Sequence, residues 1–261
     1  MTNERVLTVS KEGRVAWLRL NRPDVRNAFN AGLIAALREA FDQAGRDDSI
    51  RAIVLAGEGK VFCGGADINW MRSSLDLTYD ENVDDARAMS DMFRAIDQCP
   101  KPVIGRIHGA ALGGGAGLAA VCDVVLAGAD TVFGFTETKL GIIPAVISPF
   151  VIAKIGISNA RALFMTGERF DAKRAMHIGL IHEMVVTDTL DVCIERVVNE
   201  ILSAGPAAVA AAKALIPRVA AASYDESRDL TASAIAKQRT SREGQEGLRA
   251  FLERRKAEWT A

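Results

Sequence analysis

Histidine and cysteine are scarce in this chain, which has three histidines and four cysteines among 261 residues. No two cysteines have a C-x-x-C spacing, whereas a structural zinc site needs several such ligands close together. The sequence therefore argues against a zinc protein. Scattered cysteines with mostly apolar neighbours are typical of a reducing compartment. These cysteines are Cys63, Cys99, Cys122 and Cys193.

An excess of basic residues is also lacking. Lysine and arginine number 32 against 33 acidic residues, which gives a formal net charge of -1. A nucleic-acid-binding domain would be clearly basic, so this class is disfavoured. The first residues contain no apolar signal core. The longest uncharged stretches are rich in Gly and Ala or broken by Pro144 and Pro149. We therefore expect no membrane span and a cytoplasmic location.

Apolar runs and helical periodicities alternate through roughly the first 200 residues. Apolar side chains spaced four apart after Asn30 predict a helix with Asn30 as its cap, and a second amphipathic helix is predicted over 83–98. The polar segment 76–81 is predicted to be a loop. Strands are predicted at 15–20, 50–55, 103–107, 122–127 and 131–135. This alternation predicts an α/β fold with a largely parallel sheet over 1–200, followed by a helical region over 201–261.

Two glycine-rich segments each follow a predicted strand and open a predicted helix. They are Gly64-Gly65-Ala66 and Gly113-Gly114-Gly115. A nucleotide loop is not found. The nearby sequence Gly57-Glu58-Gly59-Lys60 lacks the first glycine of a Walker motif, since Val54 stands there, and Val61 replaces the Ser or Thr. The G-x-G-x-x-G pattern starting at Gly113 ends on Leu118.

The same two segments, Gly64-Gly65-Ala66 and Gly113-Gly114-Gly115, suit a backbone anion site. Glycine lets N–H groups approach a ligand closely, and a helix N-terminus adds partial positive charge. If both segments face one cleft, their N–H groups hold one developing oxyanion, and each donor lowers the barrier by roughly 3 kcal/mol. The alternative is that these glycines only allow close packing of helix on strand.

The order of motifs along the chain resembles the crotonase superfamily, the enoyl-CoA hydratase/isomerase family. The resemblance covers nearly the whole chain. Its main segments are 21–23 (NRP), 62–68 (FCGGADI), 107–115 (IHGAALGGG), 133–137 (FGFTE), 140–144 (LGIIP), 166–170 (TGERF) and 246–255 (EGLRAFLERR).

The resemblance implies a ClpP/crotonase-like spiral of ββα units with a helical C-terminal trimerisation region. It implies an acyl-CoA thioester substrate, self-association as a trimer or a dimer of trimers, and no metal, flavin or nicotinamide cofactor. The N–H groups of Ala66 and Gly114 would stabilise the thioester enolate. The residues matching the family's substrate and CoA contacts are Val25, Arg26, Ala28, Gly64, Gly65, Ala66, Asp67, Ile68, Gly114 and Pro144.

Hydratases of this family usually carry two glutamates, and this chain matches only one of them. Glu137 is present, but Gly117 stands at the other position. Hydration needs a positioned water, a base for it and a proton for the α-carbon, tasks that two carboxylates share naturally. A single glutamate can shuttle a proton between the α- and γ-carbons, which is isomerase chemistry. The sequence thus leaves open an enoyl-CoA hydratase, a Δ3-Δ2-enoyl-CoA isomerase and an acyl-CoA-binding protein without turnover.

Local detail is similar to bacterial hydratases of branched, carboxylated substrates, namely the 3-methylglutaconyl-CoA and γ-carboxygeranoyl-CoA hydratases. The matching segments are 67–71, 82–87, 144–150 and 243–248. This similarity suggests a branched carboxylated enoyl-CoA as substrate. The gap at Gly117 then suggests the hypothesis that the substrate's own carboxylate helps to position the water.

Several neighbours of these motifs have simpler structural interpretations. Asp67 is predicted to cap the helix after the first glycine loop. His108 and Asp123 are predicted to make structural hydrogen bonds, and Cys63, without a partnered base, is predicted to be inert. Whether Trp70 and Met71 line an acyl pocket or fill the core stays open from the sequence.

Overall fold

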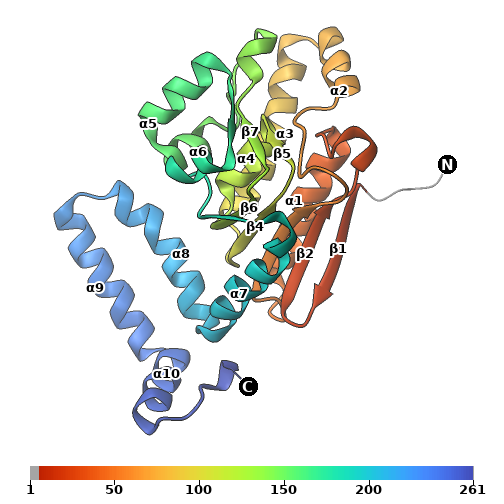
Figure 1. Cartoon of the computed structure of the whole chain (residues 1–261). Coiled ribbons are helices and arrows are strands. Elements are labelled where there is room, and N and C mark those ends of the chain that lie inside the picture. The colour runs from red at the N-terminus through yellow and green to blue at the C-terminus, as the bar shows by residue number, and fades with distance from the viewer. Residues whose placement is uncertain (1–5, 261) are drawn as a thin grey trace.

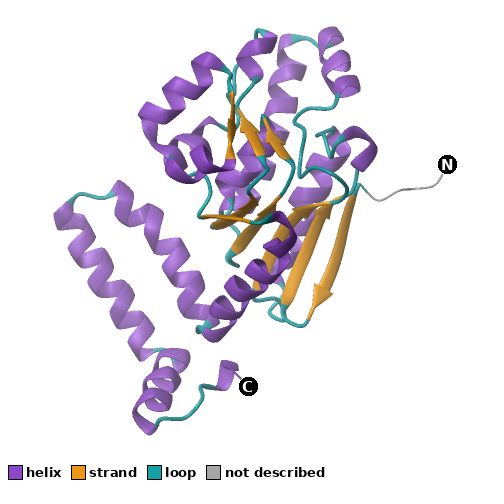
Figure 2. Cartoon of the chain, in the orientation of Figure 1, coloured by secondary structure: helices purple, strands orange, loops and turns teal. Residues whose placement is uncertain are grey.

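The computed structural model describes residues 6–260. A six-stranded sheet with the order β1-β2-β3-β4-β6-β9 forms its centre (Figures 1 and 2). β1 and β2 form an antiparallel hairpin, and the other neighbours are parallel. The strands are β1 (Leu7–Glu12), β2 (Val15–Leu20), β3 (Ala52–Gly57), β4 (Val103–Ile107), β6 (Val124–Gly128) and β9 (Glu183–Val185).

Both faces of this sheet are buried, but against different helices. Successive side chains of a strand point to opposite faces, so Ile53 and Leu55 join one apolar cluster while Ala52 and Val54 join the other. The larger cluster holds α1 (Ala31–Arg46), α3 (Tyr79–Asp97) and α4 (Gly114–Val121). The smaller one holds α7 (Leu190–Ser203).

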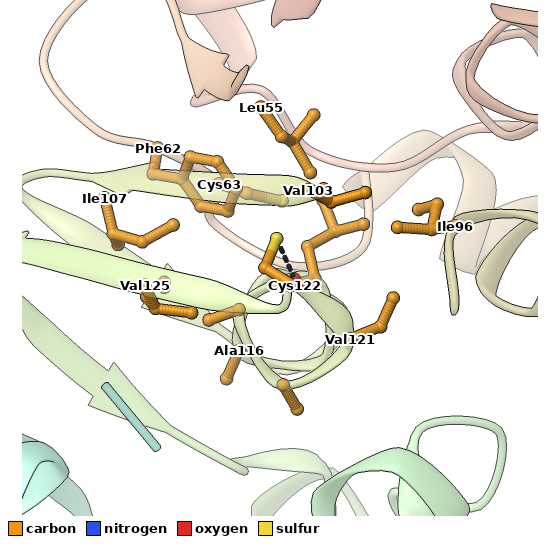
Figure 3. Close-up of a cluster of buried hydrophobic side chains, with 14 of the residues drawn as sticks. Leu55, Phe62, Cys63, Ile96, Val103, Ile107, Ala116, Val121, Cys122 and Val125 are labelled. Carbon is orange, nitrogen blue, oxygen red and sulfur yellow. Dashed lines mark hydrogen bonds between the residues drawn. The ribbon is translucent and has the colours of Figure 1, made fainter. Parts of the chain in front are cut away.

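The helix α4 lies within the core, and all of its residues are buried. Figure 3 shows the surroundings of Cys122, the residue that ends it, where Ala116 and Val121 lie near side chains of β3, β4 and β6. The Cys122 thiol donates a hydrogen bond to the Leu118 carbonyl at 3.1 Å. Because α4 consists of small and aliphatic residues, it can approach the sheet closely.

A second, three-stranded sheet with the order β5-β7-β8 aligns two loops of the candidate site. β5 and β7 are parallel, with Leu112 opposite Gly134. The residues that follow these strands, Gly113 and the 3-10 turn Glu137–Leu140, therefore lie at the same edge of the sheet. The strands are β5 (Ala110–Leu112), β7 (Val132–Gly134) and β8 (Arg169–Asp171), and α5 (Ser148–Thr166) and α6 (Ala172–His177) lie beside them.

The last helices form an arm that projects from the sheets (Figure 1). They are α8 (Pro206–Ala221), α9 (Tyr224–Thr240) and α10 (Arg242–Glu253). Neither α8 nor α9 contains a buried residue. The boundary expected after residue 200 falls inside α7, and the division into two parts stays a prediction. Within residues 6–260 no single helix is long and apolar enough to span a membrane. One bent pair of helices, Thr187–Ser203 with Pro206–Ala221, has the length and composition of a membrane span, but nothing else indicates one.

The expected helix after Asn30 is confirmed, because the Asn30 side chain accepts a hydrogen bond from the Leu33 N–H at 2.9 Å. The expected loop over 76–81 is wrong. Thr78 and Glu81 form a capping box, so α3 begins at Tyr79, four residues before the predicted start. The strand predicted at 122–127 begins two residues later in the structure, at Val124, because Cys122 ends α4.

Candidate active site

A cavity of about 440 Å³ lies between the two glycine segments. Its walls come from the loop after β3, from α2 (Ile68–Ser73), from one face of α3, from the start of α4 and from the segment 136–147. The lining is mostly apolar. Of the predicted site residues, the structure brings together on this cavity Gly64, Gly65, Ala66, Gly114, Glu137 and Pro144.

The Ala66 N–H is available to a ligand. Ala66 forms a parallel bridge with Phe29. The two hydrogen bonds of this bridge run from the Phe29 N–H to the Gly65 carbonyl and from the Asp67 N–H to the Phe29 carbonyl. The N–H of Ala66 itself takes no part and has no acceptor among the described residues. An unpaired N–H on the wall of an apolar cavity can donate to a ligand oxygen.

The Gly114 N–H is available for a different reason. Gly114 is the first residue of α4, and the first N–H groups of a helix have no partner within it. A Cβ atom at Gly114 would lie 2.9 Å from Phe29 Cε2 and 3.0 Å from Met89 Cε. A Cβ atom at Gly115 would lie 2.6 Å from the Cys63 carbonyl oxygen. Close packing therefore requires glycine at both positions, and the role of the Gly114 N–H as an oxyanion donor stays a prediction.

Glu137 is the acid next to these donors. Gly113 has φ +52°, and a Cβ atom there would lie 3.1 Å from Glu137 Oε1. The other oxygen, Oε2, is buried and has no hydrogen-bond partner among the described residues. Burial raises the pKa of this carboxyl group, and a backbone hydrogen bond only partly opposes it. Such a group holds and releases a proton nearer to neutral pH than an exposed glutamate does.

The position of the missing second glutamate is filled. A Cβ atom on Gly117 would lie 2.4 Å from Ile147 Cγ2 and 3.1 Å from Phe93 Cζ. Because not even a methyl group fits on Gly117, the space beside it is already filled by apolar side chains. The structure offers no empty space there for a second acid.

The other predicted contacts lie outside the cavity lining. Val25, Arg26 and Ile68 are exposed, and a Cβ atom on Gly64 would lie 3.1 Å from Arg26 Cβ, so Arg26 stands at the rim. Ala28 is buried beside this rim. The Asp67 side chain caps α2 and pairs with Arg22 at 2.6 Å, so the predicted cap is confirmed. Their contacts with CoA stay predictions.

The structural interpretations of three neighbours agree with the geometry. His108 contacts the Gly59 carbonyl through Nε2 at 2.9 Å and does not line the cavity. The Asp123 carboxylate accepts from the Val103 N–H at 2.7 Å and pairs with Lys213. Burial raises the pKa of Cys63 to about 12, which makes the thiol unreactive. Trp70 and Met71 line the cavity, and Trp70 also packs against the apolar core.

Sequence reasoning missed Asp85, the second acid of the cavity lining. It lies on α3 with Asn82, Ala86 and Met89, a spacing that places all four on one helical face toward the cavity. In the sequence it belongs to the polar run Asp84-Asp85, and nothing distinguishes it from its exposed neighbour. Among residues 6–260 no group of three or more His, Cys, Asp or Glu side chains is arranged to hold a metal ion.

Comparison with known proteins agrees with this geometry. The family model "Enoyl-CoA hydratase/isomerase" matches residues 10–261. The chain is 31% identical over 259 residues to the crotonyl-CoA hydratase of Syntrophomonas wolfei, covering 98% of each protein.

Solved structures show the same fold. An enoyl-CoA hydratase from Shewanella pealeana superposes with a TM-score of 0.95 at 35% identity, over 98% of this chain and 97% of that one. A Legionella pneumophila protein, provisionally named an enoyl-CoA hydratase/isomerase (crotonase), gives 0.93 at 42% identity, over 98% and 99%. This chain belongs to the enoyl-CoA hydratase/isomerase family, the crotonase superfamily.

Proposed function

We propose that the protein adds water to the double bond of an enoyl-CoA thioester, or removes it in reverse. One observation carries this proposal: two unpaired backbone N–H groups and a buried acid with an unpartnered oxygen share one mostly apolar cavity. The relatives named above as hydratases support it.

In this mechanism the thioester oxygen accepts hydrogen bonds from the N–H groups of Ala66 and Gly114. The oxygen of water adds to the β-carbon, and the electron pair of the double bond moves onto the thioester as an enolate. Both donors then face the developing negative charge, which is where preorganised donors lower a barrier most. Glu137 takes a proton from the water and returns one to the α-carbon, which balances the addition. Its raised pKa suits both steps.

A second activity, Δ3-Δ2-enoyl-CoA isomerisation, is favoured by the packing at Gly117. Because Ile147 fills the space of the second glutamate, Glu137 is the one acid beside the two donors in the described part of the chain. One acid suffices to move a proton from the α- to the γ-carbon. Incubation with a 3-enoyl-CoA in heavy water separates the two activities, because isomerisation moves the double bond without a net gain of water.

The branched carboxylated acyl group that the sequence suggested is not part of this proposal. The cavity lining contains two carboxylic acids, Asp85 and Glu137, and within residues 6–260 it contains no lysine, arginine or histidine. A substrate carboxylate would thus find no counter-ion. A neutral enoyl chain suits this lining better.

The decisive experiment is an assay of several enoyl-CoA thioesters by mass change, with the Glu137→Gln variant as control. We expect a gain of one water with the wild type and a loss of at least about 100-fold in kcat with the variant. The variant keeps the shape of the side chain, so CoA thioesters should still bind. Binding without any turnover by the wild type would instead favour an acyl-CoA-binding protein, and unchanged activity in the variant would refute the role of Glu137.

We propose further that the arm of α8, α9 and α10 mediates self-association as a trimer or a dimer of trimers. Exposed apolar side chains on the arm support this proposal, because isolated chains rarely leave so many in water. Sedimentation of the purified protein gives its mass directly and tests the proposal. These side chains are Ile216, Ile235, Leu248, Phe251 and Leu252.

A further inference from the structure

Asp85 is a carboxylic acid on the wall of the cavity that the proposed mechanism does not use. Its side chain is half-buried on α3, and the indole of Trp70 lines the same cavity. Burial raises the pKa of Asp85, and the nearby Trp70 indole opposes this. Part of the water around the carboxyl group is therefore excluded.

No cation compensates this carboxyl group. Among the described residues Asp85 takes part in no ion pair, and its neighbour Asp84 pairs with Arg87 at 3.0 Å on the exposed side of α3. Asp85 also borders a surface hollow that contains Arg38, but that arginine pairs with Asp91 at 3.3 Å. The negative charge of Asp85 thus acts on the cavity without a neutralising partner.

The place of Asp85 along α3 relates it to the acyl chain. Met89 lies beside the Gly114 donor, because a Cβ atom placed on Gly114 would lie 3.0 Å from Met89 Cε. Asp85 precedes Met89 by one helical turn, about 6 Å along the axis. Asp85 thus lies within the reach of a five-carbon acyl group whose thioester oxygen is bound at Gly114, and the proposal below takes the acyl chain to extend toward it.

We propose that Asp85 is a specificity-determining residue that excludes acyl chains with a terminal carboxylate and so restricts the site to neutral acyl-CoA thioesters. The physical cause is like-charge repulsion between two carboxylates in a partly dehydrated cavity without a counter-ion. This inference rests on the proposed function only in taking the cavity as the acyl site.

The test uses binding of two saturated thioesters that cannot be hydrated, so it does not depend on turnover. Pentanoyl-CoA and glutaryl-CoA share a five-carbon chain and differ in a terminal methyl or carboxylate. We expect the wild type to bind pentanoyl-CoA at least about tenfold more tightly by calorimetry at neutral pH, the size expected for one close like-charge contact. Asp85→Asn keeps the shape of the side chain and removes its charge, so it should clearly reduce this preference.

The matched control is Asp84→Asn, which removes one negative charge from the same helix at an exposed position. It should leave the preference as in the wild type. The proposal is overturned if the wild type binds both thioesters equally, or if Asp85→Asn and Asp84→Asn show the same preference. Absence of hydration with every enoyl-CoA, together with the expected binding preference, would refute the proposed function and leave this inference standing.

Discussion

Glu137 lies in surroundings that favour its neutral form, and this has a consequence for stability as well as for catalysis. Its Oε2 is buried without a hydrogen-bond partner, and its pKa is raised above the usual 4.5. A group with a raised pKa in the folded state contributes stability that is present below the unfolded pKa. This contribution is lost as the pH rises through the folded pKa.

Replacing Glu137 by Gln should therefore stabilise the fold at neutral pH while it abolishes turnover. The amide cannot ionise, so we expect the variant to be more stable by about 1 to 3 kcal/mol at pH 8, because it avoids placing an ionised carboxylate in this buried site. The difference should shrink toward pH 4, where the wild-type acid is also neutral. Thermal unfolding over this pH range measures it.

The control for this prediction is Glu195→Gln, a change at an exposed position of α7. It should show no comparable pH-dependent gain. A wild type that is more stable than Glu137→Gln at every pH would mean that the carboxylate is held by favourable contacts, which would contradict its described surroundings.

The short helix α2 follows directly on the Ala66 donor, and its first turn is fixed by one side chain with two tasks. Asp67 accepts from the Asn69 N–H at 2.7 Å and forms a largely buried ion pair with Arg22. Burial is the largest single effect on the pKa of Asp67 and would by itself raise it. The hydrogen bonds and the charge of Arg22 together outweigh burial, so the pKa is lowered. The carboxylate is therefore ionised at neutral pH.

We expect Asp67→Ala to destabilise the protein by about 3 kcal/mol, because it removes a cap and leaves a buried arginine unpaired. The matched change is Asp171→Ala, which removes the cap of α6 without an ion pair. That change should cost about 1 kcal/mol. Denaturant unfolding of both variants checks the comparison, and equal losses would show that the ion pair with Arg22 contributes nothing.

How far the sequence predicts these elements depends on the range of the interactions that set them. The cap at Asp67 is local, and the sequence predicted it. The capping box of Thr78 and Glu81 is equally local and was missed, because the surrounding polar residues suggested a loop. The contact of Gly117 with Ile147 joins positions 30 residues apart, and no local pattern indicates it.

The arm of α8 to α10 is tied to the central sheet through Arg51. This buried side chain, just before β3, donates to the carbonyls of Leu202 at 2.9 Å and Trp259 at 3.0 Å, and also to that of Ala204. One guanidinium thus joins the segments just before and just after the arm to one place on the sheet. No other residue type offers as many fixed donors.

Arg51→Ala should loosen the whole arm, because three carbonyls lose their donor at once. We expect faster amide hydrogen exchange over 204–260, with little change in β2 to β4, as measured by mass spectrometry. Arg14→Ala, at an exposed position nearby, is the control. Uniform acceleration over the entire chain would mean instead that Arg51 supports the global fold and not the arm.

For the whole molecule, the sequence predicted the α/β class and the helical end. It did not predict how the strands divide into two sheets. The pairing of β5 with β7 brings Gly113 and Glu137 together, and it depends on strands 20 residues apart. The family resemblance supplied Ala66, Gly114 and Glu137 as a set, whereas physical patterns alone predicted two glycine loops without their acid.

The position of Trp70 gives the protein an intrinsic optical probe. Of the three tryptophans, Trp17 lies in the sheet with Arg19 4.4 Å from its ring centre, and Trp259 donates to the Ser203 carbonyl at the arm. Trp70 alone among them borders the cavity between the glycine segments. Occupancy of that cavity is therefore coupled to a single indole, and its emission can follow the arrival of an unlabelled ligand in real time.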